Sequence, residues 1–379
     1  MFSREIESLR QKLNRASSAA PGSFDIQPGD LEAAVRALQQ IGEPETAAAE
    51  QRLLLEARRH RQERFSGNVF TIAPLYVTSI CRERCLYCNY RADSRAGGID
   101  RVRLSDDEIA AESRFLIEEK GIRAIELVYA SDPKNRADAI ARHVELVARL
   151  LDERGGGIVG ISAESLSEDE YRQLVAAGAT FSILWQETYD RARYEELHPG
   201  ADGKADFAWR IDAPERMIRA GIPAVGMGVL SGLSEWRQDW AMLVTHEAWL
   251  RNRFGRSASI LGIPRLRPAG GAAFTDSSFL PRDSDLESAI SIHTLFSPES
   301  VPFVSTREEW DFGLRLAAGG GVLFTFNCST IPGGYSLGAS GDQFRTGSWD
   351  IHTHAQVMRT AGMTPVSRWS FRDGMPAAG

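Results

Sequence analysis

Three cysteines in one short loop are the residues of this chain whose types and spacing point most directly to chemistry. Cys81, Cys85 and Cys88 have a Cys-x3-Cys-x2-Cys spacing and follow an apolar, strand-like run. Three thiolates on one loop can bind three irons of a cubane [4Fe–4S] cluster and leave the fourth iron open to a small molecule. A zinc site would need a fourth Cys or His nearby in a recognisable spacing, and none follows the loop. The spacing therefore predicts a reactive iron–sulfur cluster, with zinc or buried free thiols as the alternatives.

An aromatic residue beside the third cysteine adds a resemblance to this prediction. Tyr87 directly precedes Cys88, and with it the loop resembles that of the radical S-adenosylmethionine (SAM) superfamily. In that superfamily the amino and carboxylate groups of SAM occupy the open iron. The resemblance implies two cofactors, a [4Fe–4S] cluster and S-adenosyl-L-methionine.

Composition excludes several classes of protein. The chain has 379 residues, is 43% hydrophobic, and carries a net charge of −7, so it lacks the basic footprint of a nucleic-acid-binding protein. No apolar run approaches the roughly 20 residues that span a bilayer, and the charged N-terminal sequence lacks the apolar core of a signal peptide. The fourth cysteine, Cys328, is far from the loop, which excludes a disulfide framework. We expect a cytoplasmic protein without nucleic-acid or membrane partners.

From Asn68 onward, strand-like apolar runs alternate with helical patterns. This alternation predicts a parallel sheet, and eight strands with eight helices predict an α/β fold of the (β/α)8 TIM-barrel type. The expected strands are residues 69–78, 124–129, 158–163, 180–186, 224–229, 257–262, 302–305 and 322–326. The expected helices are residues 106–120, 135–153, 167–176, 206–220, 237–252, 283–296, 308–317 and 351–361.

We expect three parts along the chain. Residues 1–66 read as a helical, largely polar N-terminal extension packed on the main domain, residues 67–365 as the barrel, and residues 366–379 as a C-terminal tail. Reactive groups in such barrels gather at the C-terminal ends of the strands. The cysteine loop follows the first strand and therefore belongs to that end.

Polar residues follow the second, third and fourth strands. Ser131 and Asp132 occupy the place where the superfamily commonly has a Gly-Gly-Glu-like turn that holds the amino group of SAM, and either side chain can accept its hydrogen bonds. Glu164 either pairs with SAM or faces solvent. Gln186 and Glu187 end the fourth strand, and a buried carboxylate there needs a partner. For most members of the polar cluster that comes next, a solvated loop and helix face is favoured: Tyr194, His198, Lys204, Asp206 and Arg210.

Further candidates lie at strands one, six and seven. Tyr76 can turn its ring into the barrel, where core packing is the commoner role. Arg265 and Arg267 alternate between prolines after the sixth strand and suit either carboxylate recognition or ion pairs with helix carboxylates. Arg307 follows the seventh strand beside a helix N-terminus, which favours anion binding.

Several motifs in order narrow the resemblance to one group of the superfamily. They are Ala-Pro-Leu-Tyr at 73–76, Gln-Glu-Thr-Tyr at 186–189, Pro-Arg-Leu-Arg-Pro at 264–268, Ser-Thr-Arg-Glu at 305–308, Pro-Gly-Gly-Tyr at 332–335 and Gln-Phe at 343–344. With these motifs, residues 50–365 resemble the aromatic amino-acid lyases, above all the tyrosine lyases of thiamine biosynthesis. Family members that mature hydrogenases carry a second cluster on C-terminal cysteines, and this chain has none after Cys328.

The resemblance implies a defined reaction. Reductive cleavage of SAM gives a 5′-deoxyadenosyl radical, which abstracts hydrogen from the amino group of the substrate. The Cα–Cβ bond then breaks, and tyrosine yields 2-iminoacetate (dehydroglycine) and p-cresol. The implied partners are a small amino-acid substrate, an electron donor such as flavodoxin or ferredoxin, and a thiazole synthase.

The resemblance also assigns roles to single residues. Arg307 would clamp the substrate carboxylate, and Tyr76 would lie close to the substrate amine. The residues expected around SAM are Tyr87 near the adenine, Gln186 and Glu187, with Arg265 and Arg267 supporting either carboxylate.

Three departures from the family pattern keep other functions open. The chain has Ala130-Ser131 in the Gly-Gly-Glu place, a less acidic run at 344–350, and Phe326-Asn327-Cys328 in a loop expected at the ring end of the substrate. One alternative is a paralogous lyase acting on tryptophan or another amino acid in a specialised pathway. The other is a non-catalytic iron–sulfur or zinc-binding scaffold.

Overall fold

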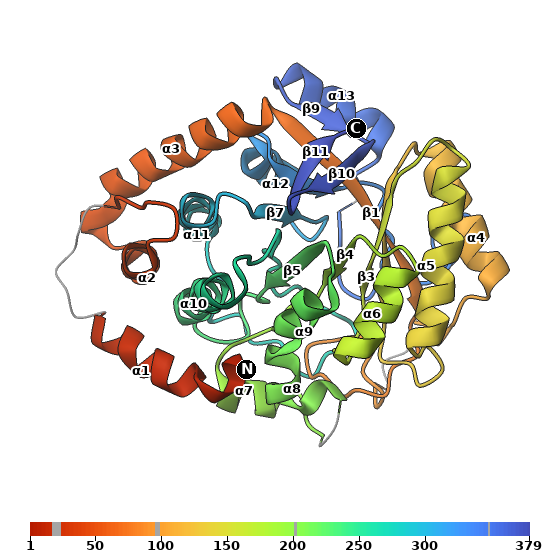
Figure 1. The fold of residues 1–379 in the computed structure, drawn as a ribbon, viewed down its shortest axis with the longest axis horizontal. Coiled ribbons are helices and arrows are strands. Elements are labelled where there is room, and N and C mark those ends of the chain that lie inside the picture. The colour runs from red at the N-terminus through yellow and green to blue at the C-terminus, as the bar shows by residue number, and fades with distance from the viewer. Residues whose placement is uncertain (17–23, 95–98, 201–202, 348) are drawn as a thin grey trace.

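Eight parallel strands close into the barrel that the strand–helix alternation predicts (Figure 1). The computed structural model describes residues 1–16, 24–94, 99–200, 203–347 and 349–379. The strands follow one another in chain order from β2 to β8, and β1 closes the ring by pairing with both β8 and β2. Their bounds are β1 Asn68–Thr78, β2 Ala124–Tyr129, β3 Ile158–Ser162, β4 Phe181–Ile183, β5 Ala224–Gly228, β6 Ile260–Gly262, β7 Val301–Val304 and β8 Val322–Thr325.

Helices surround the barrel and connect its strands. Since the strands are covered on both faces, they read as nearly continuous apolar runs, and β1 is buried along almost all of its length. The helices after β1 are α4 Asp106–Arg114, α5 Ala137–Asp152, α6 Glu168–Ala176, α7 Arg191–Leu197, α8 Phe207–Ile211, α9 Ala213–Ala220, α10 Trp236–Phe254, α11 Asp283–Phe296, α12 Trp310–Ala317 and α13 Ile351–Thr360. No described helix is long and apolar enough to cross a membrane.

Two of the expected helices differ in detail from the observed ones. The single helix expected at 206–220 is two helices that meet at Asp212, because Pro214 lacks an N–H and suits the first turn of α9. The helix expected at 106–120 is α4 followed by a π-helical turn, Phe115–Glu119. The short helix α7 was not expected.

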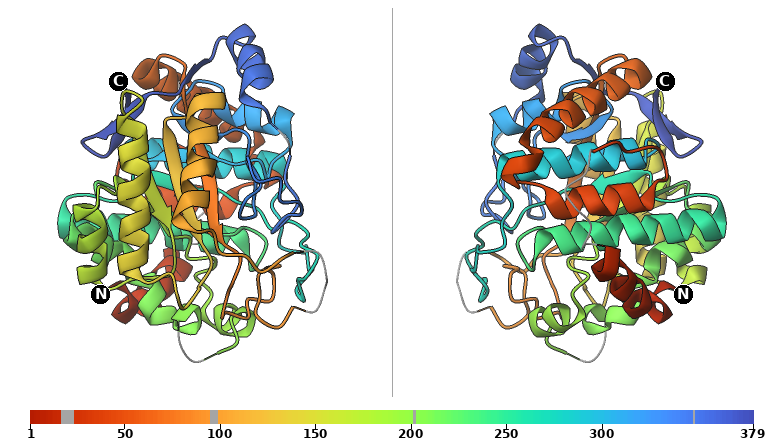
Figure 2. Two further views of the ribbon diagram at one scale, coloured as in Figure 1. Left: turned by 90° about the vertical axis from the view of Figure 1, so that its right-hand side faces the viewer. Right: turned by 90° about the vertical axis from the view of Figure 1, so that its left-hand side faces the viewer.

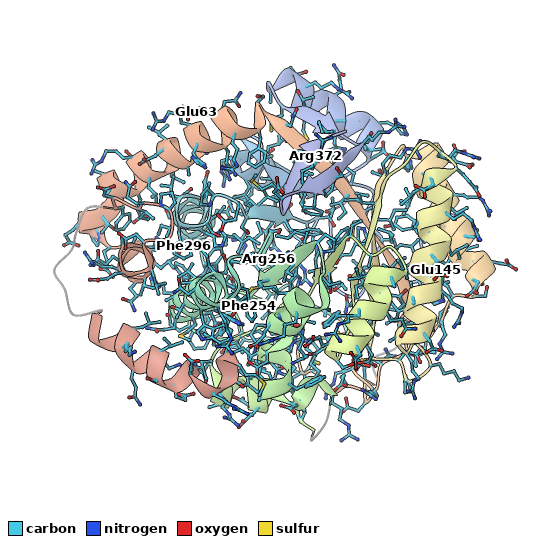
Figure 3. All side chains as sticks on the ribbon, viewed as in Figure 1. Glu63, Glu145, Phe254, Arg256, Phe296 and Arg372 are labelled. Carbon is cyan, nitrogen blue, oxygen red and sulfur yellow. The ribbon has the colours of Figure 1, made fainter. Side chains whose placement is uncertain are left out.

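The N-terminal helices form a second layer on one side of the barrel. They are α1 Ile6–Ala16, α2 Leu31–Gln40 and α3 Ala47–Phe65. Helix α2 packs on α10 and α11, and α3 lies along α11 (Figure 2). Side chains such as the buried Phe296 fill the space between these layers, whereas Glu63 and Glu145 lie at the periphery (Figure 3).

The last residues form strands rather than an irregular tail. Strand β9, Thr364–Val366, pairs with the start of β1, and β10 Trp369–Arg372 and β11 Met375–Ala378 form an antiparallel hairpin. Trp369 packs against Phe70 at the N-terminal end of the barrel and belongs to the same apolar cluster as Ala124 and Ile158. This end is therefore filled with apolar side chains, which leaves the opposite end for the site.

Candidate active site

A cavity of about 230 Å³ opens at the C-terminal end of the barrel. Cys81, Cys85 and Cys88 all line it, together with residues from the other strand ends. Backbone hydrogen bonds hold their loop: Arg82 N donates to Ser131 O at 3.0 Å, and Leu86 N donates to Leu197 O at 3.0 Å. The loop is thus tied to the segment that follows β2 and to the last residue of α7.

The three thiols fit the cluster that their spacing predicts. All are free of disulfides, and burial raises the pKa of Cys85 to about 12, so its thiolate would need the positive charge of a metal. The described residues contain no group of three or more His, Cys, Asp or Glu arranged around a single metal ion. A cubane cluster offers each thiolate its own iron, so its three cysteines need not converge on one point.

A buried network of charges lies beside the cluster loop. Glu187 accepts a hydrogen bond from Lys204 Nζ at 2.6 Å, and Arg210 Nη2 lies 3.4 Å from the same carboxylate oxygen. Burial raises the pKa of Glu187, but the two cations outweigh it and hold the pKa at about 2. The backbone of Glu187 has φ of 73°, a left-handed conformation that bulky residues rarely adopt. An anionic carboxylate is therefore held with two cations at the end of β4.

Tyr87 borders the same network through its hydroxyl and its ring. The Tyr87 hydroxyl donates to His198 Nε2 at 2.8 Å, since His198 Nδ1 lies 2.7 Å from the carbonyl oxygen of Tyr194 and carries the proton. Lys204 Nζ lies 5.5 Å from the centroid of the Tyr87 ring. Burial first, then the charge of Lys204, lowers the pKa of His198 to about 3, so the ring is neutral.

Gln343 joins Tyr76 to the third cysteine. The Tyr76 hydroxyl donates to Gln343 Oε1 at 3.2 Å, and Gln343 Nε2 donates to Cys88 Sγ at 3.3 Å. Tyr76 also makes an edge contact with Tyr90, with ring centroids 6.3 Å apart. The orientation of the Tyr76 side chain is thus coupled to the cluster loop.

Arg307 enters the cavity without a carboxylate partner among the residues that the structure describes. Its guanidinium carbon lies 3.3 Å from the centroid of the Phe344 ring, and the side chain makes no described ion pair. Burial lowers the pKa of Arg307 from its usual value, which still leaves it a cation. A stacked, unpaired guanidinium in a cavity is suited to a carboxylate ligand.

The remaining predicted residues divide between cavity and scaffold. Glu164 lines the cavity and pairs with Arg82 at 2.9 Å, and Ser131 lines it without a described side-chain hydrogen bond. Arg267 also lines it, with Nη2 3.0 Å from Glu308 Oε2 and a buried Nε that has no described partner.

Three predicted residues do not line the cavity. The carboxylate of Asp132 accepts from Thr78 Oγ1 at 2.9 Å and from Arg103 Nε at 2.7 Å, so it ties the segment after β2 to the end of β1 and to Arg103. Gln186 points to the other side of its strand, where its Nε2 donates to Thr188 O at 3.3 Å. Arg265 is held by Glu308 and by Asp283, the latter at 2.8 Å.

Several cavity residues escaped the sequence analysis. Lys204 and Arg210 reach the cavity and pair with Glu187, and Tyr194 and His198 are buried, so for these four the solvated-surface interpretation is wrong. Glu126 lies in the middle of β2 and lines the cavity, and its position as one carboxylate in the apolar run 124–129 was the available signal.

Comparisons with known proteins agree with this geometry. The family model described as "Radical SAM superfamily" matches residues 75–244. The chain is 32% identical to 2-iminoacetate synthase of Escherichia coli (strain K12) over 291 residues, which is 76% of this chain and 73% of that protein. It is 30% identical to 3-methylornithine synthase of Methanosarcina acetivorans over 206 residues, covering 54% of this chain and 55% of that protein.

The fold is also similar to solved structures. The FeFe-hydrogenase maturase HydG from Carboxydothermus hydrogenoformans superposes with a TM-score of 0.80 and 25% identity, covering 96% of this chain and 80% of that chain. The likeness extends over the barrel and over most of the chain outside it.

Proposed function

Because the chain belongs to the radical SAM superfamily, we propose that it is a lyase that cleaves the Cα–Cβ bond of tyrosine to 2-iminoacetate and p-cresol. Its cofactors are a [4Fe–4S] cluster and SAM. The observation that carries the proposal is Arg307, a half-buried cation without an ion-pair partner among the described residues, in the same cavity as the three cysteines. The similarity to 2-iminoacetate synthase over 76% of the chain supports tyrosine as the first substrate to test.

The lining of the cavity offers groups for two ligands. Cys81, Cys85 and Cys88 would hold the cluster, and Tyr87 and Glu187 would contact SAM on the side of the charge network. Glu164, Ser131 and Arg267 line the cavity and complete the polar surface available to SAM. Arg307, Tyr76 and Gln343 would contact the amino acid.

The chain's own contribution to the reaction is orientation. When bound, the cluster and SAM would supply the radical chemistry that removes a hydrogen atom from the substrate amine. Arg307 would fix the substrate carboxylate, and the Tyr76 hydroxyl, held by Gln343, would lie beside the amine. Fixing both groups presents an N–H bond in one geometry, and such positioning is the main help a protein gives to a radical step.

A second candidate is a lyase for tryptophan or another amino acid. The observation that favours it is Cys328, which lines the cavity in the loop after β8 where the family pattern differs. Asn327 beside it has φ of 49°, and its Nδ2 donates to Asp350 at 2.7 Å, so the loop is held in this form. The proposed partners are an electron donor such as flavodoxin or ferredoxin and, for tyrosine as substrate, a thiazole synthase of thiamine biosynthesis.

Product analysis tests both candidates. The reconstituted protein is incubated without oxygen with SAM, dithionite and each aromatic amino acid in turn. Formation of p-cresol and glyoxylate, the hydrolysis product of 2-iminoacetate, from tyrosine supports the first candidate. Full cleavage of SAM without p-cresol excludes it, and a product from another amino acid supports the second. A reconstituted cluster that never cleaves SAM would favour the scaffold alternative.

A further inference from the structure

The cavity contains a carboxyl group that forms no hydrogen bond or ion pair with any of the described residues. Glu126 is the third residue of β2, in register with Pro74 of β1 and Gly160 of β3. It lines the cavity and is 6% exposed, yet no hydrogen bond or ion pair joins it to another described side chain or backbone group. Burying a carboxyl group without a partner costs free energy, so such a group is retained for a purpose other than stability.

The surroundings of Glu126 explain its isolation. Two residues earlier on the same face of β2 is Ala124, which belongs to the apolar cluster that fills the lower barrel with Ile158 and Trp369. Glu126 is thus a polar group directly above an apolar layer. The titratable groups whose pKa values respond to it are Tyr76 and Cys328, which line the same cavity.

Burial raises the pKa of Glu126 to about 8, so the group is mainly a neutral carboxylic acid at pH 7. A neutral carboxylic acid has one O–H donor and a free carbonyl acceptor. It can therefore exchange hydrogen bonds with a hydroxyl group without the cost of burying a charge.

Glu126 and Arg307 lie at different depths of the cavity. Glu126 is three residues before the end of β2, which places it roughly 10 Å below the end of that strand at about 3.3 Å per residue. Arg307 comes after the end of β7 and stacks on Phe344 in the loop after β8. An amino acid whose carboxylate binds Arg307 can direct its side chain into the barrel toward Glu126.

We infer that Glu126 binds the hydrogen-bonding group at the far end of the substrate side chain, the phenol hydroxyl of tyrosine, and rejects amino acids that lack such a group. The inference deepens the proposed function and rests on an amino-acid substrate held by Arg307. The physical reason is that ligands with and without a hydroxyl group affect the buried carboxyl group differently. A ligand with a hydroxyl group satisfies the buried carboxyl, whereas phenylalanine would leave it unpaired beneath the ring.

Two substitutions separate hydrogen bonding from shape. Glu126→Met removes the hydrogen bond and keeps the length of the side chain, whereas Glu126→Gln keeps a neutral donor and acceptor in the same place. Because Glu126→Met replaces an unpaired buried carboxyl with an apolar group, we expect it to fold with a melting temperature at or above that of the wild type. Glu126→Leu serves as a second apolar variant.

The measurement is the dissociation constant of tyrosine, phenylalanine, tryptophan and lysine, by calorimetry on the cluster-reconstituted protein with SAM and without reductant. We expect the wild type to prefer tyrosine to phenylalanine by about 100-fold or more. In Glu126→Met the dissociation constants of tyrosine and phenylalanine should differ by no more than about threefold. In Glu126→Gln the preference for tyrosine should stay within about tenfold of the wild-type preference.

The outcomes distinguish this inference from the proposed reaction. An unchanged preference in Glu126→Met and Glu126→Leu overturns the inference even when p-cresol is formed. If no p-cresol forms but both apolar variants lose the preference for tyrosine over phenylalanine, the tyrosine lyase proposal is overturned. The inference about Glu126 then still stands. Tighter binding of lysine than of tyrosine, or no binding of any of the four amino acids to the wild type, also overturns it.

Discussion

At the scale of single residues, the charges in the cavity differ in whether the protein itself pairs them. Glu187 is neutralised by Lys204 and Arg210, and Glu164 by Arg82. Arg307 and Glu126 have no such partner among the residues described. Paired groups shape the cavity, while unpaired groups retain their binding capacity for a ligand.

The first residue-scale prediction concerns Arg307. Arg307→Ala should lower turnover of the amino acid by about 100-fold or more, since it removes a charge-assisted contact from the substrate alone. Cleavage of SAM should continue without coupling to product. The measurement is the ratio of deoxyadenosine to product, with Arg307→Lys, which keeps the charge and loses the planar fork, as the control. Normal product formation by Arg307→Ala would refute the carboxylate clamp.

The second residue-scale prediction concerns Glu187. Glu187→Gln leaves Lys204 and Arg210 without their anion, so we expect a loss of about 3 kcal/mol in the free energy of unfolding at pH 7. Urea unfolding measures it. The matched control is Glu196→Gln, which breaks an exposed pair with Arg193 at 2.7 Å and should cost less than about 1 kcal/mol.

The pH dependence of the Glu187 effect has a definite sign. The two cations hold the pKa of Glu187 at about 2 despite burial, below the value of about 4.3 in an unfolded chain. The folded state therefore binds fewer protons between these values, and the stabilisation is complete above about pH 4.3 and lost as the pH falls toward 2. The difference between wild type and Glu187→Gln should shrink over that interval. A constant difference from pH 7 to pH 3 would contradict this assignment.

At the scale of elements, the C-terminal hairpin closes the end of the barrel away from the site. Trp369 is 2% exposed, its indole Nε1 donates to Thr71 O at 2.9 Å, and its ring lies 5.5 Å from that of Phe70. The hairpin thus completes the apolar layer on which the floor of the cavity rests.

The element-scale prediction follows from this packing. Trp369→Ala should lower the free energy of unfolding by about 3 to 5 kcal/mol, because it opens a cavity and removes a buried hydrogen bond. Arg372→Ala, on the exposed face of the same strand, should change it by no more than about 0.5 kcal/mol. Equal effects of the two substitutions would show that the hairpin is not part of the core.

At the scale of the whole molecule, the N-terminal helices and the barrel share one hydrophobic core. Phe2 is fully buried, with its ring stacked 3.9 Å from that of His246 on α10. Arg58 of α3 pairs with Glu287 of α11 at 2.6 Å. We therefore expect the extension and the barrel to unfold together.

The whole-molecule prediction tests this coupling. Phe2→Ala should destabilise the protein by about 3 to 5 kcal/mol and keep a single unfolding transition by circular dichroism and by tryptophan fluorescence. Arg4→Ala, an exposed neighbour, is the control. Two separate transitions would instead indicate that residues 1–66 are an independent unit.

The sequence by itself determined the barrel and the chemistry of its loop. Alternating strand and helix patterns allow few other arrangements, and the spacing of Cys81, Cys85 and Cys88 is a local feature of the sequence. Both predictions can therefore be made without knowledge of contacts between distant residues. For the same reason the eight strands were predicted close to their observed positions.

Only the tertiary structure decided which neighbouring polar residues face the cavity. Arg267 lines it while Arg265 does not, because side-chain direction alternates along an extended chain and the phase of that alternation is set by pairing with other strands. Glu187 lines it from a left-handed backbone position while its neighbour Gln186 does not. Lys204 and Arg210 reach Glu187 from a 3₁₀ turn and a helix that lie 17 and 23 residues further along the chain, a contact that no local pattern encodes. Among the residues that the structure describes, Glu126 has no partner on any strand of the closed barrel, and this can be seen only when every strand is in place.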